Sequence, residues 1–267
     1  MITRQGRLLV TNIGRLLTMV PRPGDPLGAI ENAAVLVENG EIARVGPRDS
    51  FELDSLGEIE TIDANGKLVT PGLIEPHAHP IFAGSRAGEF DLRARGATYL
   101  EIQAAGGGIR ATVRATRAAS DEELLALTLA RLDGLLAHGV TVCEAKSGYS
   151  LDLDGELRLL RLLARAAESH PIDLSPTLLA HVLPPEVQSE SGRAEYIDRF
   201  IAELIPAVAP AQSGARPLAE SVDVFCDRGA FTLDETRLIL EAARARGLAL
   251  RVHAEQLSHT GAADLAA

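Results

Sequence analysis

The sequence predicts an α/β protein: an incomplete (β/α)8 TIM barrel, with about five of its eight strands present, that follows a small N-terminal β-sandwich-like domain. Three observations support this prediction. From Lys67 onward, apolar strand-like runs alternate with amphipathic helical segments, whereas short strands and Asn-Gly turns fill the preceding part of the chain. Polar side chains also follow most of the strand-like runs. We therefore expect a small β-domain at residues 1–66 and a barrel domain at residues 67–267.

The first domain consists of short apolar runs joined by turns. The expected strands are residues 8–10, 34–37, 41–45 and 60–62. Asn39-Gly40 predicts a tight hairpin turn between the second and third strands, because such turns favour residues that adopt positive φ. Asn65-Gly66 predicts a second hairpin turn. No cluster of reactive side chains occurs in this domain, so we expect the functional site in the barrel domain.

The barrel domain alternates predicted strands and helices. The expected strands are residues 68–74, 140–143, 172–179, 222–225 and 248–252. Two of the helices between them begin with capping boxes, Ser120–Glu123 and Thr232–Glu235, followed by apolar residues at a helical period. A closed barrel gathers the ends of all its strands into one ring, whereas an open sheet gathers only those at its switch point. Because polar residues follow most of the strands, we favour the barrel.

Histidines provide the first candidate site. His77 and His79 lie two residues apart at the end of a strand, so both side chains face the same side and can reach one point. Neutral imidazole suits zinc or iron, although two histidines in a surface loop would have the same spacing. His253 follows the fifth strand. Alone it is more often a hydrogen-bonded rim histidine, but three ligands with one open position are typical of a catalytic zinc site.

Other polar side chains follow the remaining strands. Lys146 is either a carboxylated metal bridge or, more simply, the ion-pair partner of Glu144. Tyr149 either contacts a substrate or caps the barrel, and His181 either binds substrate or is inert. Arg86, in the first loop of the barrel domain, either clamps a substrate carboxylate or is a solvated surface arginine.

The overall composition excludes several classes of partner. A net charge of −11 argues against nucleic acid and against an anionic membrane surface. Cys143 and Cys226 lie in apolar runs, which indicates buried thiols in a reducing compartment. We expect no secretory leader, because the N-terminal residues MITRQGRLLV contain no secretory h-region, and no apolar run approaches the length of a membrane span. We expect a cytoplasmic protein.

Five segments together resemble the imidazolonepropionase family, metal-dependent amidohydrolases of histidine degradation. In chain order they are PGLIEPHAHPIFAGSRAGEF, AGGGI, TVCEAKSGYSLD, LLAHVLPPE and LRVHAEQLSHTGA, and the match runs from about residue 65 to the end. The resemblance implies hydrolysis of the cyclic amide bond of 4-imidazolone-5-propanoate to N-formimidoyl-L-glutamate. It also implies one ion per site, Zn2+ or Fe3+, and suggests a homodimer for the full-length form.

The resemblance assigns roles to particular residues. The metal ligands would be His77, His79 and His253, and the substrate contacts would be Arg86, Tyr149, His181 and Gln256, with Tyr99 as a weaker candidate. Family members carry a proton-handling histidine and a metal-binding aspartate further along the barrel, so we expect these groups beyond Ala267 and assign no catalytic residue within the chain. Residues 210–217 look like a local insertion.

Two alternatives and one consequence remain at this stage. The alternatives are another cyclic-amide or deaminating amidohydrolase, and a non-catalytic metal-binding module. The consequence follows from the strand count. A barrel with five strands leaves two unpaired strand edges and uncovered apolar faces. Unpaired edges and exposed apolar faces favour association with another chain. We therefore expect a fragment that is aggregated, molten or assembled with another chain, and that lacks hydrolase activity.

Overall fold

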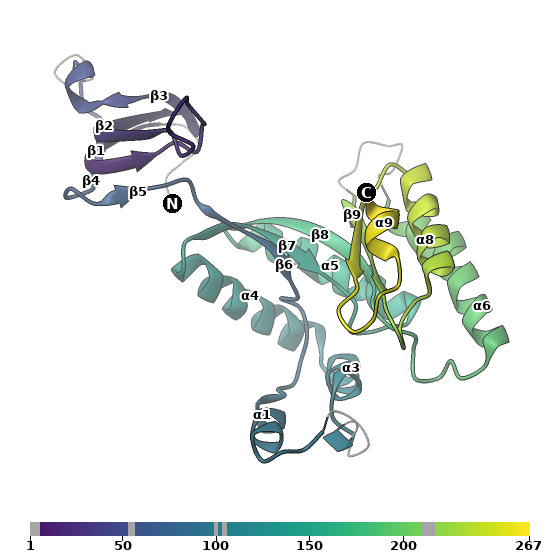
Figure 1. Cartoon of the computed structure of the whole chain (residues 1–267). Helices are drawn as coiled ribbons and strands as arrows, with labels where there is room; N and C mark the ends of the chain where they lie inside the picture. The colour runs from purple at the N-terminus through teal and green to yellow at the C-terminus, as the bar shows by residue number, and fades with distance from the viewer. Residues whose placement is uncertain (1–5, 53–56, 99–100, 103–105, 210–216) are drawn as a thin grey trace. The chain divides into compact units, whose positions relative to one another are not determined.

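The computed structural model describes residues 6–52, 57–98, 101–102, 106–209 and 217–267. Tyr99 and residues 210–216 of the expected insertion lie outside the described residues. Contacts divide the chain into two compact units, Met1–Gly72 and Leu73–Ala267 (Figure 1), so the division falls a little later than the expected boundary after Gly66. None of the described helices is long and apolar enough to span a membrane.

The first unit is built on one mixed sheet. Its strands are β1 (Arg7–Leu17), β2 (Ala29–Glu38), β3 (Glu41–Pro47), β4 (Glu60–Asp63) and β5 (Leu68–Val69), with a 3-10 turn η1 (Arg48–Ser50) after β3. The order is β3-β2-β1-β4, and β5 also pairs with β1. Small apolar clusters lie around this sheet, one with Leu36 and Phe51 and another with Ile13 and Val35. A second sandwich layer stays a prediction.

The two Asn-Gly pairs behave differently. Asn39 and Gly40 have φ of 53° and 84° and join the antiparallel strands β2 and β3, which confirms the first predicted hairpin. The second predicted hairpin is wrong. Asn65 and Gly66 also have positive φ, of 52° and 70°, but β4 and β5 both run parallel to β1. This turn therefore carries the chain from one stretch of β1 to the next.

The sequence predicted one strand at residues 68–74, and the structure has two strands there. Leu68–Val69 pairs with β1 in the first unit, whereas β6 (Leu73–Ala78) begins the sheet of the second unit. Pro71-Gly72 separates them, because proline has no N–H to donate to a strand ladder.

The second unit contains a curled, fully parallel sheet, half of a barrel. Its strands are β6, β7 (Val140–Lys146), β8 (Asp173–Ala180), β9 (Ser221–Cys226) and β10 (Ala249–Ala254). They lie side by side in chain order, without the reversal of a doubly wound sheet (Figure 1). The carboxyl ends of the strands therefore lie along one edge. The prediction of a barrel rather than a doubly wound sheet is confirmed for these five strands, which form half of a barrel.

The described helices of this unit are α1 (Ala87–Ala94), α3 (Ile109–Ala118), α4 (Asp121–Ala137), α5 (Leu153–Ser169), α6 (Glu190–Arg199), α7 (Ile205–Val208), α8 (Leu233–Ala245) and α9 (Ala262–Ala266), with a π-helical turn η3 (Phe200–Leu204) between α6 and α7. Helices α4, α5 and α8 pack against the strands of the sheet, whereas α1 and α3 lie away from it in Figure 1. Ser120 accepts from the Glu123 amide, and Thr232 and Glu235 form a complete capping box. Leu160, Val222 and Ile239 are fully buried in the core between helices and strands.

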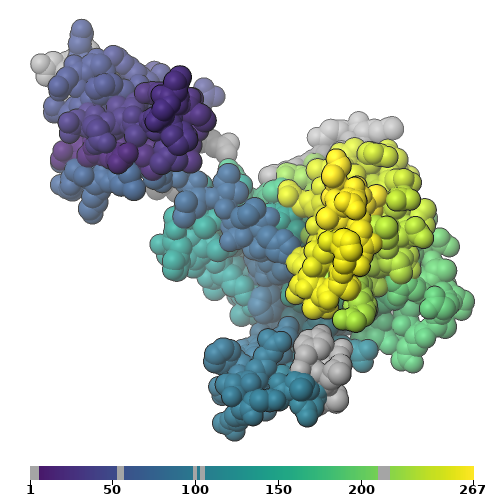
Figure 2. All heavy atoms as spheres, viewed as in Figure 1, coloured from purple at the N-terminus to yellow at the C-terminus, as the bar shows by residue number. Residues whose placement is uncertain are grey.

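The C-terminal residues lie at the surface of this unit. Figure 2 shows them in yellow beside the preceding βα repeat, and α9 packs against β10.

Candidate metal centre and active site

The sheet brings three of the predicted histidines together. His77 is on β6, His79 follows it, and His253 is on β10, the other outer strand of the sheet. The ring centroids of His77 and His79 are 5.8 Å apart, and those of His77 and His253 are 5.3 Å apart. Residues separated by most of the chain therefore meet at one point.

The donor atoms of this arrangement suit a metal ion, but the side chains do not form a complete coordination sphere. With a Zn–N bond of about 2.1 Å, the ring centroids of two imidazole ligands lie roughly 5 Å apart, close to the observed separations. His79 Nδ1 is buried and has no hydrogen-bond partner among the described residues. In the described part of the chain, however, no group of three His, Cys, Asp or Glu side chains has the geometry of a metal site.

Burial keeps the imidazoles of His77 and His79 neutral. Burial, reinforced by the neighbouring His181 and His77, lowers the pKa of His79 to about 3. Burial also lowers the pKa of His77, together with the charge of Lys146, while Asp223 opposes the shift. Since only neutral imidazole can donate its lone pair to a metal, both rings are ligand-ready at neutral pH.

His181 and Tyr149 form the next wall of the site. His181 Nδ1 donates to the Gly148 carbonyl at 3.0 Å, which leaves Nε2 without the proton, and burial lowers its pKa to about 4. The Tyr149 ring lies 5.1 Å from His79 and 5.4 Å from His181, centroid to centroid. Burial raises the pKa of the Tyr149 phenol, so this group is a neutral hydrogen-bonding hydroxyl.

The loop that carries Tyr149 depends on a residue that the sequence did not single out. Glu156, in the first turn of α5, is 1% exposed, and its carboxylate accepts from the amides of Gly148, Ser150 and Leu151 at 2.6–2.8 Å. Burial raises its pKa. Three amides on one carboxylate fix the loop and, through Gly148, the ring of His181.

Arg86 and Gln256 are placed differently from one another. Gln256 Oε1 is 2.6 Å from His253 Nε2, so it belongs to the histidine cluster. Arg86 is 43% exposed and pairs through Nε with Glu89 at 2.9 Å. Its charge still opposes the rise in the Tyr149 pKa, which places it within electrostatic reach of that hydroxyl.

The cluster encloses a cavity of about 50 Å3. Its lining residues are His77, His79, Leu179, His181, Asp223, Phe225, His253 and Gln256. Phe225 also lines a larger cavity of about 470 Å3 that includes Pro184, Arg228 and Leu257. The small cavity has room for an ion and a water, and a substrate would need the space beyond Phe225.

Glu144 and Lys146 lie within β7 rather than after it, which corrects their expected position. Lys146 Nζ is 2.7 Å from Glu144 Oε1 and 2.7 Å from Asp223 Oδ2, and the three side chains are at most 4% exposed. The simpler interpretation of Lys146, an ion pair with Glu144, is confirmed.

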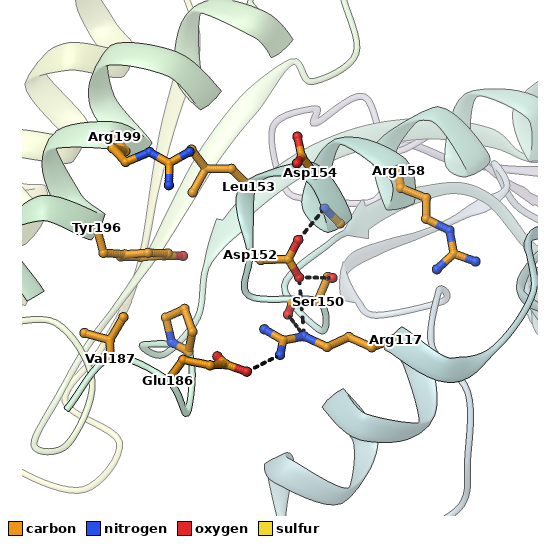
Figure 3. A pocket seen from close by; sticks show the side chains of 12 residues that line it. Arg117, Ser150, Asp152, Leu153, Asp154, Arg158, Glu186, Val187, Tyr196 and Arg199 are labelled. Atoms are coloured by element: carbon orange, nitrogen blue, oxygen red, sulfur yellow. Dashed lines mark hydrogen bonds and ion pairs between the residues drawn. The ribbon is translucent and has the colours of Figure 1, made fainter. Parts of the chain in front are cut away.

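Another cavity, of about 590 Å3, lies beside the same loop (Figure 3). Its arginines already have partners: Arg117 lies 3.3 Å from Asp152 and 2.6 Å from Glu186, and Arg199 pairs with Glu203. Tyr196 donates to the Leu151 carbonyl at 2.8 Å. These contacts tie α3 and α6 to the loop, so the histidine cavity, although smaller, is the better candidate site.

Comparisons with known proteins point in one direction. A model described as "Amidohydrolase family" matches residues 60–102. The chain is 47% identical over 100% of its length to the imidazolonepropionase of Geobacillus kaustophilus (strain HTA426) and 48% identical over 97% to that of Myxococcus xanthus (strain DK1622). It spans 62% of the length of each of these curated relatives.

Solved structures show the fold. A triazine hydrolase from Arthobacter aurescens has a TM-score of 0.59 at 16% identity, over 95% of this chain and 54% of that one. A 5-methylcytosine deaminase from Klebsiella pneumoniae, liganded with phosphonocytosine, has a TM-score of 0.56 at 20% identity, over 92% and 51%.

Proposed function

We propose that the chain is a member of the imidazolonepropionase family of amidohydrolases, and that its site serves the metal-dependent hydrolysis of 4-imidazolone-5-propanoate to N-formimidoyl-L-glutamate. One observation carries the proposal: histidines from the two outer strands of a half-barrel line one cavity. The imidazolonepropionases of Geobacillus kaustophilus and Myxococcus xanthus match 100% and 97% of this chain.

We propose that His77, His79 and His253 hold the ion, which is Zn2+ or Fe3+. Both ions accept neutral imidazole. When bound, such an ion polarises a carbonyl oxygen and lowers the pKa of a bound water to about 7. The low pKa of His79, about 3, keeps that ligand unprotonated over the working pH range.

The remaining side chains bind and orient the substrate in this proposal. Within the described part of the chain Arg86 pairs with Glu89 through Nε, and in this proposal the other N–H groups of its guanidinium bind the substrate propionate. Tyr149 offers a neutral hydroxyl, and His181 offers the unprotonated Nε2. Phe225, whose ring centroid is 5.0 Å from that of His253 and 6.1 Å from that of His181, limits the access of water.

Product analysis tests this function. A form of the protein extended to the length of its relatives is purified, supplemented with metal and incubated with 4-imidazolone-5-propanoate, and N-formimidoyl-glutamate and ammonia are both measured. Ring opening without ammonia supports the proposal. Ammonia without ring opening would replace it with a deaminase, and a protein that binds metal but converts no substrate would leave a metal-binding module.

A further inference from the structure

The loop after β7, residues 147–151, is buried although it has no regular secondary structure. Loops usually lie at the surface, because a buried loop must find a partner for each of its backbone N–H and C=O groups. This loop carries Tyr149, and its Gly148 carbonyl accepts from His181 Nδ1. Its conformation therefore sets the position of two candidate substrate contacts.

The backbone of this loop is also strained. Leu151 has a φ of 69°, in the left-handed region that side chains larger than that of glycine rarely adopt. Such a conformation persists only where the surrounding contacts impose it. The contacts that hold the loop are therefore part of what places Tyr149.

Side chains from three helices supply these contacts. Glu156 of α5 accepts from the loop amides, and Tyr196 of α6 donates to the Leu151 carbonyl. Arg117 of α3 donates from Nε to the Ser150 carbonyl at 2.7 Å. Arg117 is 29% exposed and lines the cavity of about 590 Å3 beside the loop (Figure 3). It is the most exposed of the three anchors, so it can be changed without opening the core.

Two carboxylates fix the Arg117 guanidinium. Its Nη1 lies 2.6 Å from Glu186 Oε1, and its Nε lies 3.3 Å from Asp152 Oδ2. Because a guanidinium is planar and its donors have fixed directions, such pairs set its orientation as well as its position. Glu186 lies in the segment that follows His181. Arg117 thus connects α3, the loop of Tyr149 and the segment after His181.

Arg158 offers a matched comparison on the same cavity (Figure 3). It is 31% exposed, its Nη2 donates to the Ala119 carbonyl at 2.6 Å, and its Nε pairs with Asp121. Arg158 makes no hydrogen bond to residues 147–151 within the described part of the chain. Arg117 and Arg158 therefore share residue type, exposure, a carbonyl and an ion pair, and differ in the segment that they hold.

We propose that Arg117 is a positioning residue of the site. Its guanidinium holds the strained loop at the Ser150 carbonyl, and so places the Tyr149 hydroxyl and, through Gly148, the ring of His181. Arg117 is not among the described residues that line the histidine cavity, so it acts through the loop. The inference rests on the proposed function, in which Tyr149 and His181 bind the substrate.

Fluorine NMR of protein labelled with fluorotyrosine tests the proposal without metal or substrate. The chain has three tyrosines, so the Tyr149 resonance is assigned by its loss in Tyr149→Phe. We expect this resonance to shift toward its position in the unfolded protein in Arg117→Gln and to stay at the wild-type position in Arg158→Gln. Both substitutions remove a charged donor from a carbonyl and an ion pair, so the two variants should melt at similar temperatures.

Kinetics provide a second measurement, in the form of the protein extended to the length of its relatives. Arg117→Gln should lower kcat/KM by up to about 100-fold, mostly by raising KM, because misplaced binding groups no longer meet the substrate. Arg158→Gln should stay near the wild-type value. If Arg117→Gln does not fold, Arg117→Lys and its control Arg158→Lys, which keep the charge but lose the fork of donors, replace the pair, with the same difference expected.

The outcomes separate this inference from the proposed function. A Tyr149 resonance that behaves alike in Arg117→Gln and Arg158→Gln would overturn the role of Arg117 and leave the proposed function intact. An extended wild-type protein that does not open the ring of 4-imidazolone-5-propanoate would overturn the proposed function. A shift confined to Arg117→Gln would then still support the part of Arg117 in holding the loop.

Discussion

Individual side chains at this site are tuned by burial. His79 and His181 have pKa values of about 3 and about 4, in each case chiefly because the imidazolium would lose its hydration. Neutral rings can donate to a metal or a substrate without first losing a proton. The same burial makes the folded protein sensitive to acid.

The pH dependence of stability follows from His181. Above about pH 6.5 its ring is neutral in the folded and unfolded chains, so it adds no pH dependence. Below that pH the unfolded chain binds the proton first, so the free energy of unfolding falls as the pH drops toward about 4. His181→Gln should remove up to about 3 kcal/mol of that fall.

Urea unfolding of the metal-free protein at pH 7 and pH 4.5 measures this difference. The control is His259→Gln, since the His259 side chain is 83% exposed. Identical pH dependence in the wild-type protein and His181→Gln would contradict the assignment.

Arg86 is expected to act in substrate binding rather than in chemistry. In a form of the protein that converts substrate, Arg86→Ala should lower kcat/KM by a factor equivalent to about 2–4 kcal/mol of transition-state binding, mostly by raising KM. The reason is that the substrate propionate loses its cationic partner. Arg93→Ala, on the same helix, is the control. An analogue without the propionate should be insensitive to the change, and equal losses on both substrates would reject the clamp.

Sequence reasoning reached some of these residues and not others. Spacing placed His77 and His79 on one side of a strand, and His253 at another strand end. Asp223 and Glu156 gave no local signal, because their roles depend on partners elsewhere in the fold: Lys146 for Asp223, and the backbone of a loop for Glu156.

At the scale of the element, the loop after β7 is the part on which the site most depends. It presents Tyr149, and its Gly148 carbonyl fixes His181. Gly148 has a φ of 103°, and a Cβ there would lie 2.7 Å from Leu179 Cδ2, so glycine is required. Glu156 holds this conformation from the start of α5.

Glu156→Gln tests how the loop is held. A glutamine offers one carbonyl oxygen where the carboxylate accepts three amides, so at least one buried N–H loses its partner. We expect a loss of about 1–3 kcal/mol in stability, together with a raised KM as Tyr149 loses its place. Glu168→Gln, an exposed site on the same helix, should change neither thermal melting nor KM. Wild-type behaviour in Glu156→Gln would refute this role.

Elements with local signals were predicted best. Both predicted capping residues, Ser120 and Thr232, begin helices, because a cap is a contact within four residues. The apolar run at residues 68–74 misled the prediction, since hydrophobicity continues across Pro71 although strand pairing does not. Asn65-Gly66 has the φ of a hairpin turn, and only the distant partner β1 decides that no hairpin forms.

At the scale of the whole second unit, the sheet has two outer strands, β6 and β10. Apolar side chains on these strands are exposed, with Ile74 at 67%, Leu73 at 55% and Leu250 at 40%. Strand edges with exposed apolar residues favour pairing with another chain.

Association of the chain is therefore expected in solution. Gel filtration should give species larger than a monomer, and Ile74→Lys, which places a charge on β6, should reduce their size. Lysine at Leu136, a 38% exposed residue of α4, is the control and should have no effect. A monodisperse monomer with a cooperative melt, in the wild-type protein and the variant alike, would contradict the expectation of open edges.

The central claim is that histidines from β6 and β10 bind the same metal ion. Metal content after dialysis against a mild chelator tests this directly, in the wild-type protein, in His77→Ala, His79→Ala and His253→Ala, and in the control His259→Ala. The wild-type protein and the control should keep the ion, and each of the other three variants should lose it, because two remaining imidazoles hold it too weakly. Retention of metal by His253→Ala at the wild-type level would show that β10 contributes no ligand, and would contradict the proposed site.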